Sequence, residues 1–209
     1  MKAFAWLLSF SFMASGGKII NFDTGPVGKV PPGWTVAMTN RGGAPLWEIR
    51  PDHTAPTQPY VLAQISNDGT RNRFPLAILN GVTMRDGDVS VRIKPVAGKG
   101  EQAGGLVWRY RDENNYYLAR ANALENNVAV YKMENGQRIP LLAMVKHPIA
   151  SNAWCILKVS LKGNRIQVYI DHRRILEARD GTFAGPGKVG LCTVGDSVTY
   201  FDDFRVYPK

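Results

Sequence analysis

The feature that most constrains this chain is the regular alternation of short runs of apolar and polar residues with turn-forming dipeptides. Asn135-Gly136 separates two such runs, and Asn-Gly strongly favours a hairpin because both central residues of a type I′ turn need positive φ. Runs of this kind predict β-strands, and no segment carries a convincing helical period. The expected strands are 19–22, 34–38, 46–49, 60–65, 74–79, 89–96, 104–111, 115–122, 127–134, 137–145, 154–161, 165–170, 175–178, 187–194 and 199–206.

So many short strands without a helix predict a double-layer architecture, in which each sheet buries one face against the other. The chain has 209 residues, enough to bury a core without help from a metal or a disulfide. It shows no repeat, low-complexity segment or linker. The sequence therefore predicts an all-β jelly-roll sandwich of two antiparallel sheets, formed by residues 18–209 as one domain.

The first 17 residues have a different character. Met1 and Lys2 precede an apolar run from Ala3 to Met13, and small residues close it at 14–17. This order is typical of a secretory signal peptide, and the run is too short to span a bilayer. We therefore expect residues 1–17 to be a cleaved signal and the protein to be secreted or periplasmic, with no integral membrane segment in the mature chain. A buried N-terminal strand or helix is the alternative.

The chain is basic, with a formal net charge of +9. Its Lys and Arg residues are spread singly or in pairs, and no block of five like charges occurs. This pattern argues against a nucleic-acid partner. Acidic polysaccharides or lipid headgroups are the anions that such a charge favours. The sequence does not indicate an oligomeric state.

Cysteine and histidine give no metal or redox motif. Cys155 and Cys192 are the only cysteines and do not form a C-x-x-C pair. In an exported protein they can pair, or each can be a small buried apolar residue, and the sequence leaves both open. His53, His147 and His172 are far apart, so no zinc site is expected.

Three stretches look familiar: 104–122, which begins Gly-Gly-Leu-Val-Trp-Arg-Tyr-Arg, then 124–128, and the closing pair Val-Gly-Leu at 189–191 and Phe-Asp-Asp-Phe at 201–204. They resemble the concanavalin A-like, laminin G-like superfamily. Within it they are most similar to the bacterial 3-keto-disaccharide hydrolase, or family-16-glucanase-like, domain family. The resemblance is good over 85–207 and implies a jelly roll whose concave sheet faces sugar in many relatives.

The sequence does not support the catalytic chemistry of the family-16 glucanases. Glycoside hydrolysis normally uses two carboxylates that face one groove, and family-16 glucanases carry theirs as E-x-D-x-x-E, a string absent from this chain. Asp112, Glu113 and Glu125 lie in predicted turns, where solvated surface charge is the usual interpretation. No catalytic residue is identified, and whether the protein is an enzyme stays open.

Sugar-binding candidates come from the predicted meander at 104–145. Arg120 and Asn122 share one face of a strand by parity. Arg and Asn side chains bind vicinal hydroxyls or carboxylates, and aromatic rings stack on sugars. The alternative is that the aromatic residues belong to the core and the arginines to solvent. The candidates for substrate binding are Arg109, Arg120, Asn122, Asn127, Trp108, Tyr116 and Trp47.

A structural Ca²⁺ is a further expectation, because the resemblance implies one where the first and last strands of such domains meet. Asp23 begins the domain and Asp202 ends it, and Ca²⁺ takes six to eight oxygen ligands. The alternative is that these carboxylates accept hydrogen bonds from turn amides.

Three functions are consistent with these observations. The first is an exported carbohydrate-binding protein that takes an oligosaccharide or polysaccharide on its concave sheet. The second is a 3-keto-glycoside hydrolase or lyase, which rests on the resemblance alone. The third is an envelope structural domain that binds protein.

Overall fold

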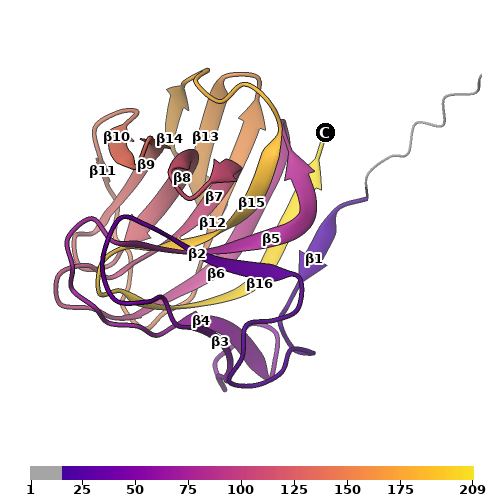
Figure 1. Cartoon of the computed structure of the whole chain (residues 1–209), viewed down its shortest axis with the longest axis vertical. Helices are drawn as coiled ribbons and strands as arrows, with labels where there is room; N and C mark the ends of the chain where they lie inside the picture. The colour runs from indigo at the N-terminus through magenta and orange to yellow at the C-terminus, as the bar shows by residue number, and fades with distance from the viewer. Residues whose placement is uncertain (1–15) are drawn as a thin grey trace, which may run out of the picture.

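The computed structural model describes residues 16–209 (Figure 1). The predicted signal peptide therefore lies almost wholly outside the described residues. The described part contains sixteen strands and no helix. No helix long and apolar enough to cross a membrane occurs in residues 16–209.

The strands form two antiparallel sheets that face each other (Figure 1). The first has the order β14-β13-β12-β6-β16-β4-β3, with β1 added beside β16. Its strands are β1 (Lys18–Ile20), β3 (Trp47–Pro51), β4 (Tyr60–Gln64), β6 (Gly87–Ala97), β12 (Cys155–Lys162), β13 (Arg165–Ile170), β14 (Arg173–Arg179) and β16 (Val198–Pro208).

The second sheet has the order β10-β9-β8-β7-β15-β5-β2, with β11 also paired to β9. Its strands are β2 (Trp34–Thr39), β5 (Phe74–Met84), β7 (Ala103–Asp112), β8 (Asn115–Asn122), β9 (Asn127–Glu134), β10 (Gln137–Pro140), β11 (Val145–Lys146) and β15 (Gly187–Thr193). The predicted jelly-roll sandwich of two antiparallel sheets is thus confirmed.

Local turn chemistry explains why the meander forms as predicted. Asn135 and Gly136 have φ of 51° and 77°, as a type I′ turn requires. The predicted strand 137–145 is wrong as one element, because it is broken into β10 and β11, both paired with β9. β10 ends at Pro140, which has no N–H for a ladder hydrogen bond.

The predicted strand 74–79 is shorter than the strand in the structure. β5 continues past Leu79 to Met84, through Gly81 at a φ of 71°. The register between β5 and β15 shifts between Lys188 and Gly190, which marks a β-bulge. A bulge adds a residue to one strand and bends the sheet without ending the pairing, so the turn-like Asn80-Gly81 lies inside a strand.

The main core lies between the two sheets. Trp34 packs edge-on against Phe204, and Trp47 lies 5.5 Å from Phe201 between ring centroids. A second, smaller apolar cluster lies on the opposite face of the second sheet. Its members are Phe74, Leu76, Ile78, Ala103, Val107, Tyr116, Leu118, Ala129, Tyr131, Met133, Cys192 and Val194.

Loops fold over this second cluster and are held by one buried arginine. The Arg73 guanidinium donates hydrogen bonds to the carbonyls of Gly43 and Gly195 and to Ser66 Oγ, at 2.8–2.9 Å. Its side chain is fully buried. The loops after β2, β4 and β15 are therefore tied together at one edge of the second sheet.

The two cysteines do not pair. Both are free, with Cys155 on β12 of the first sheet and Cys192 on β15 of the second. Cys192 is fully buried in the second cluster, and Cys155 packs against the main core. The sequence left open whether the cysteines pair or act as small apolar residues, and the structure shows the second arrangement.

Candidate functional site

A polar cluster lies on the face of the second sheet that points away from the main core. Side chains along β8 alternate, so Tyr116 and Leu118 join the second cluster while Tyr117 and Ala119 join the main core. Arg120 and Asn122 continue the outward series. On β9, Asn127 has the same parity as Ala129 and Tyr131, which are also in the second cluster. The predicted shared face of Arg120, Asn122 and Asn127 follows from this alternation.

The sheet makes room for the long side chain of Arg120. In the strand register it lies between Gly105 of β7 and Ala129 of β9. A Cβ at Gly105 would lie only 2.7 Å from Cys192 Sγ and 2.4 Å from the Ala119 carbonyl oxygen. Gly105 is therefore required by close approach of the strands, and the same absence of a side chain leaves space for the guanidinium.

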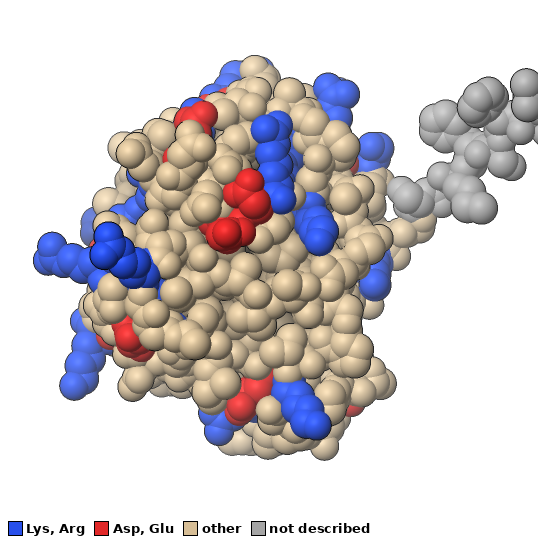
Figure 2. All heavy atoms as spheres, in the orientation of Figure 1, with Lys and Arg blue, Asp and Glu red and all other residues tan. Residues whose placement is uncertain are grey.

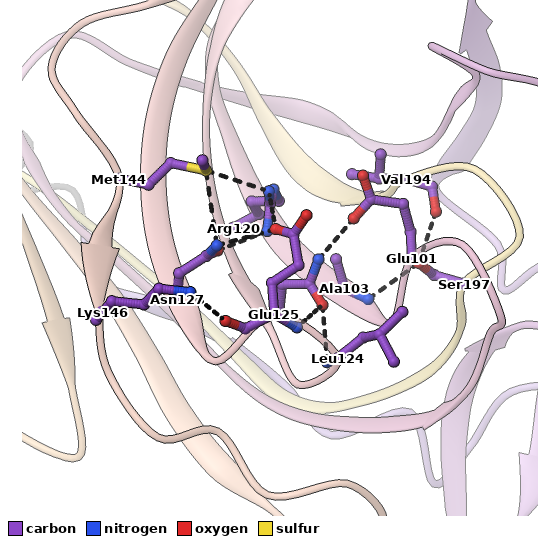
Figure 3. Close-up of polar contacts among 11 residues, drawn as sticks. Glu101, Ala103, Arg120, Leu124, Glu125, Asn127, Met144, Lys146, Val194 and Ser197 are labelled. Atoms are coloured by element: carbon purple, nitrogen blue, oxygen red, sulfur yellow. Dashed lines mark hydrogen bonds and ion pairs between the residues drawn. The ribbon is translucent and has the colours of Figure 1, made fainter.

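Arg120 is buried yet only partly bonded (Figure 3). It donates to Asn127 Oδ1 and to Glu125 Oε2, both at 2.9 Å. Its Nε is buried without a hydrogen-bond partner in the described part of the chain. Burial acts to lower the pKa of Arg120, but nearby Tyr131, Glu101 and Glu125 raise it, so the guanidinium stays charged. A buried, charged donor without a partner is the feature of this site that most needs an acceptor.

Glu125 and Asn127 complete one half of the cluster. Asn127 Nδ2 donates to Glu125 Oε2 at 2.9 Å, and Lys146 Nζ donates to the Glu125 carbonyl at 3.0 Å. Partial burial opposes ionisation of Glu125, but the bonds from Asn127 and Arg120 lower its pKa. This carboxylate is therefore ionised at neutral pH. Its side chain is 39% exposed, so it lies at the mouth of the cluster.

Glu101 and Asn122 form the other half. Asn122 Nδ2 donates a hydrogen bond to Glu101 Oε2 at 2.6 Å, while Asn122 Oδ1 accepts one from the amide of Leu124 at 2.9 Å. Asn122 thus fixes both the β8–β9 turn and the carboxylate. Burial raises the pKa of Glu101, and nearby Glu125 and Asp196 add to the rise while Arg120 and Arg138 oppose it.

A groove opens beside this cluster. Glu101 lines a cavity of about 490 Å³ together with Gly69, Thr70, Arg71, Asn72, Gly100, Arg138, Val194, Gly195 and Asp196. A second cavity of about 610 Å³ is lined by Asn40, Arg41, Thr70, Arg71, Asn72, Gly136, Gln137 and Arg138. The two share Thr70, Arg71, Asn72 and Arg138, so together they form one continuous depression, which we call the groove.

The groove has a fixed wall at its acidic end. The carboxylate of Asp196 accepts hydrogen bonds from the backbone amides of Lys99, Gly100 and Glu101 at 2.6–3.2 Å. These bonds lower the pKa of Asp196 against the effect of its partial burial. The loop that carries Glu101 is therefore held against the β15–β16 turn.

Arg109 lies elsewhere. Its backbone has a φ of 46° at an irregularity of β7. Its buried guanidinium donates to the carbonyls of Arg85, Phe183 and Gly163 at 2.6–3.2 Å. These are bonds to other loops of the protein, and Arg109 is not part of the groove.

The three aromatic candidates are buried. Trp47 and Trp108 lie in the main core between the sheets, where Trp108 stacks on Tyr117. Tyr116 faces outward but is covered in the second cluster, and its hydroxyl is 2.7 Å from Thr39 Oγ1. None of the three presents a ring face to the groove, so they are left out of the site.

The geometry at Asp23 and Asp202 favours the turn-capping alternative over a shared cation. Asp23 Oδ1 accepts the amide of Tyr60 at 3.0 Å. Asp202 accepts the amide and hydroxyl of Thr57 at 2.8–2.9 Å. Within residues 16–209 no group of three or more His, Cys, Asp or Glu side chains converges as a metal site would need.

Sequence reasoning missed Glu101, Arg138 and Asp196. Each comes from a loop or a short edge strand, where parity gives no information. The only available signal was the acid that follows the Gly98-Lys99-Gly100 turn. Three segments far apart in sequence, near 70, 100 and 195, meet here only because the sheet brings their ends together.

Comparison with known proteins places this geometry in context. No family model matches the chain. The levanase of Bacillus subtilis (strain 168) is 36% identical over 107 residues, which is 51% of this chain and 15% of the levanase. The chain thus spans only a small part of the length of that relative.

Among solved structures, the carbohydrate binding module CBM66 from Bacillus subtilis superposes with a TM-score of 0.64 at 27% identity, over 83% of this chain and 95% of the module. The β-glucanase of Bacillus licheniformis gives a TM-score of 0.63 at 14% identity, over 93% and 98% of the two chains. The second likeness is one of fold alone. Together they confirm the concanavalin A-like fold of the predicted resemblance, while its narrower 3-keto-disaccharide hydrolase branch stays a prediction.

Proposed function

We propose that this protein is a carbohydrate-binding domain that holds a saccharide in the groove over the second sheet. In this proposal Glu101 and Glu125 supply carboxylates to the sugar, and the buried Arg120, Asn122 and Asn127 hold those carboxylates in place by hydrogen bonds. The observation that carries the proposal is the bonded set of polar side chains beside the groove, in which Glu101 lines the 490 Å³ cavity and Glu125 is 39% exposed at the mouth of the cluster. Sugar hydroxyls are donors that these two carboxylates can accept.

The chemistry of the cluster suits polyhydroxyl ligands. A carboxylate accepts hydrogen bonds from two neighbouring hydroxyls, and a guanidinium or amide donates to them. The polar side chains are already fixed by bonds to one another. Little side-chain entropy is therefore lost on binding, and preorganisation of this kind improves affinity.

Similarity supports both the ligand class and the first ligand to test. One similar structure is a carbohydrate binding module, and a similar segment belongs to a levanase. Levan, a polymer of fructose, is therefore the first polysaccharide we propose as a ligand. The proposal includes export through the predicted signal peptide at residues 1–17, because the protein would encounter a polysaccharide ligand outside the cell.

A second candidate, hydrolysis of a saccharide, rests on a specific contrast in the same cluster. Burial raises the pKa of Glu101, whereas its bonded neighbours lower that of Glu125. Two carboxyl groups with pKa values moved in opposite directions are the pattern of an acid and a base. A 3-keto-glycoside, with its acidic proton next to the carbonyl, is the substrate that this candidate proposes.

Calorimetric titration with levan oligosaccharides and a panel of other neutral oligosaccharides and 3-keto-glucosides tests both candidates. The proposal predicts saturable binding with no product by mass spectrometry. Glu101→Gln is expected to weaken binding about tenfold, the effect of one charged hydrogen bond. Glu177→Gln, on the exposed β14 of the first sheet, is the matched control and should bind as the wild type does.

The other outcomes are equally informative. Product that disappears in Glu101→Gln would establish the hydrolase in place of the binding domain. No binding by any sugar of the panel would refute both, and would leave the structural, protein-binding alternative.

A further inference from the structure

Three arginines lie along the groove: Arg71 and Arg138 line both of its cavities, and Arg41 lines only the cavity without Glu101. Arg41 follows β2, Arg71 lies in the loop after β4, and Arg138 is on β10. All three line the 610 Å³ cavity, and no acidic residue of the described chain does. Figure 2 shows blue side chains protruding on the side of the molecule where Figure 1 draws the loops after β2 and β4.

These arginines have no carboxylate partner. Within residues 16–209 the ion pairs involve other side chains, and Arg41, Arg71 and Arg138 form none. Asp68, the acid of the loop after β4, instead accepts hydrogen bonds from the backbone amides of Gly43 and Thr70. Three like charges around one cavity repel each other and create a positive potential, which an anion relieves.

Arg138 is held in a fixed orientation. Its Cζ lies 5.5 Å from the ring centroid of Phe74 and 5.1 Å from that of Tyr131. A guanidinium that stacks on aromatic faces keeps the N–H groups at its edge available, and loses little entropy when it binds. Arg138 lines both cavities, so it lies where the two cavities meet.

We propose that the groove recognises a saccharide that bears an oxyanion, with a neutral sugar unit at Glu101 and the anionic group at Arg41, Arg71 and Arg138. The ligand class is an acidic saccharide, whose anion is a carboxylate, a sulfate ester or a phosphate ester. The oxygens of a carboxylate lie in a plane and those of a sulfate or phosphate ester form part of a tetrahedron, and both arrangements match the N–H edges of arginine. The inference rests on the proposed function and specifies its ligand.

The test uses one sugar backbone with and without charge. A levan oligosaccharide, its mono-sulfated form and its mono-carboxymethylated form are titrated into the full-length protein at about 20 mM salt, where screening is weak. The inference predicts about tenfold tighter binding of the charged forms, with the advantage reduced at about 500 mM salt. The two charged forms distinguish a sulfate from a carboxylate preference.

Two double variants separate a local site from overall charge. Arg41→Gln/Arg71→Gln should remove most of the advantage of the charged sugars over the neutral one. Because Arg71 also lines the cavity that contains Glu101, the neutral affinity should fall as well, but by a smaller factor than the charged affinity. Lys29→Gln/Lys162→Gln removes the same charge from exposed residues that do not line the groove, and should keep the advantage. Arg138→Gln is expected to weaken both the charged and the neutral forms, because Arg138 lines both cavities.

Four results would overturn the inference. Equal affinity for charged and neutral forms would refute it and leave the proposed function standing. An equal loss in both double variants would show general attraction by net charge. Tighter binding of single-stranded DNA than of any charged sugar would assign the arginines to nucleic acid. Failure of all forms to bind would refute the inference and the proposed function together.

Discussion

Replacement of Arg120 by Met removes the charge at the centre of the polar cluster while keeping most of its volume. The bond to Asn127 is buried, and a buried hydrogen bond to a charged group contributes about 1.5–3 kcal/mol. The pair with Glu125 involves a carboxylate that is 39% exposed, so it contributes about 0–1 kcal/mol. The variant no longer buries a guanidinium that is incompletely bonded, and this gain offsets part of the lost stability.

The net expectation for Arg120→Met is a loss of about 2 kcal/mol in the free energy of unfolding. For a domain of this size that corresponds to a fall of about 4–8 °C in Tm. Urea unfolding followed by tryptophan fluorescence measures the first, and calorimetry the second. Arg50→Met, at an exposed arginine of the first sheet, is the control and should change stability by less than about 0.5 kcal/mol.

The same variant tests the site. If Arg120 holds Glu125 and Asn127 in place beside the sugar, folded Arg120→Met should bind levan oligosaccharides about thirtyfold more weakly, which corresponds to about 2 kcal/mol. A double cycle with Glu125→Gln should show coupling between the two residues. A folded variant that binds sugar within about twofold of the wild type would refute the reasoning.

Three further predictions concern the rest of the fold. Burial raises the pKa of Asp202 to about 6, against the effect of its bonds from Thr57. The native state then holds a proton that the unfolded state has lost, so the free energy of unfolding falls by about 2 kcal/mol as pH rises from 4 to 7. Urea unfolding across this range should show the fall, and Asp202→Asn should flatten it; an unchanged slope in that variant would contradict the assignment. Gly105→Ala places a Cβ 2.4 Å from the Ala119 carbonyl oxygen and should destabilise the protein by about 1–3 kcal/mol. Urea unfolding measures this loss, and a variant as stable as the wild type would show that the strands move apart easily. Because Cys155 and Cys192 are unpaired, dithiothreitol should leave Tm unchanged, and a fall of several degrees would reveal a disulfide.

The strand pattern was readable from the sequence because alternation and turn dipeptides are local. β8, β9 and β13 have the predicted bounds, and Arg120 and Asn122 share a face as parity requires. β10 and β11 were missed as separate strands because Pro140 interrupts an otherwise apolar run. The extension of β5 was missed because Gly81 supports a bulge as readily as a turn.

The site was less predictable, for a physical reason. Alternation tells which residues share a face, but not which face is covered. Trp108 faces the main core, and Tyr116 faces outward only to be buried beneath loops. Glu101 and Arg138 reach the groove from outside the β8–β9 hairpin, and their position depends on long-range pairing that no local pattern encodes.

The central claim is that a saccharide binds in the groove over the second sheet. An NMR titration of backbone amides with a levan oligosaccharide tests it most directly. The account predicts shifts concentrated in 69–72, 100–103, 120–127, 138 and 194–196, the segments of the polar cluster and the groove. Shifts concentrated on the outer face of the first sheet, or none at a concentration where calorimetry shows binding, would contradict it.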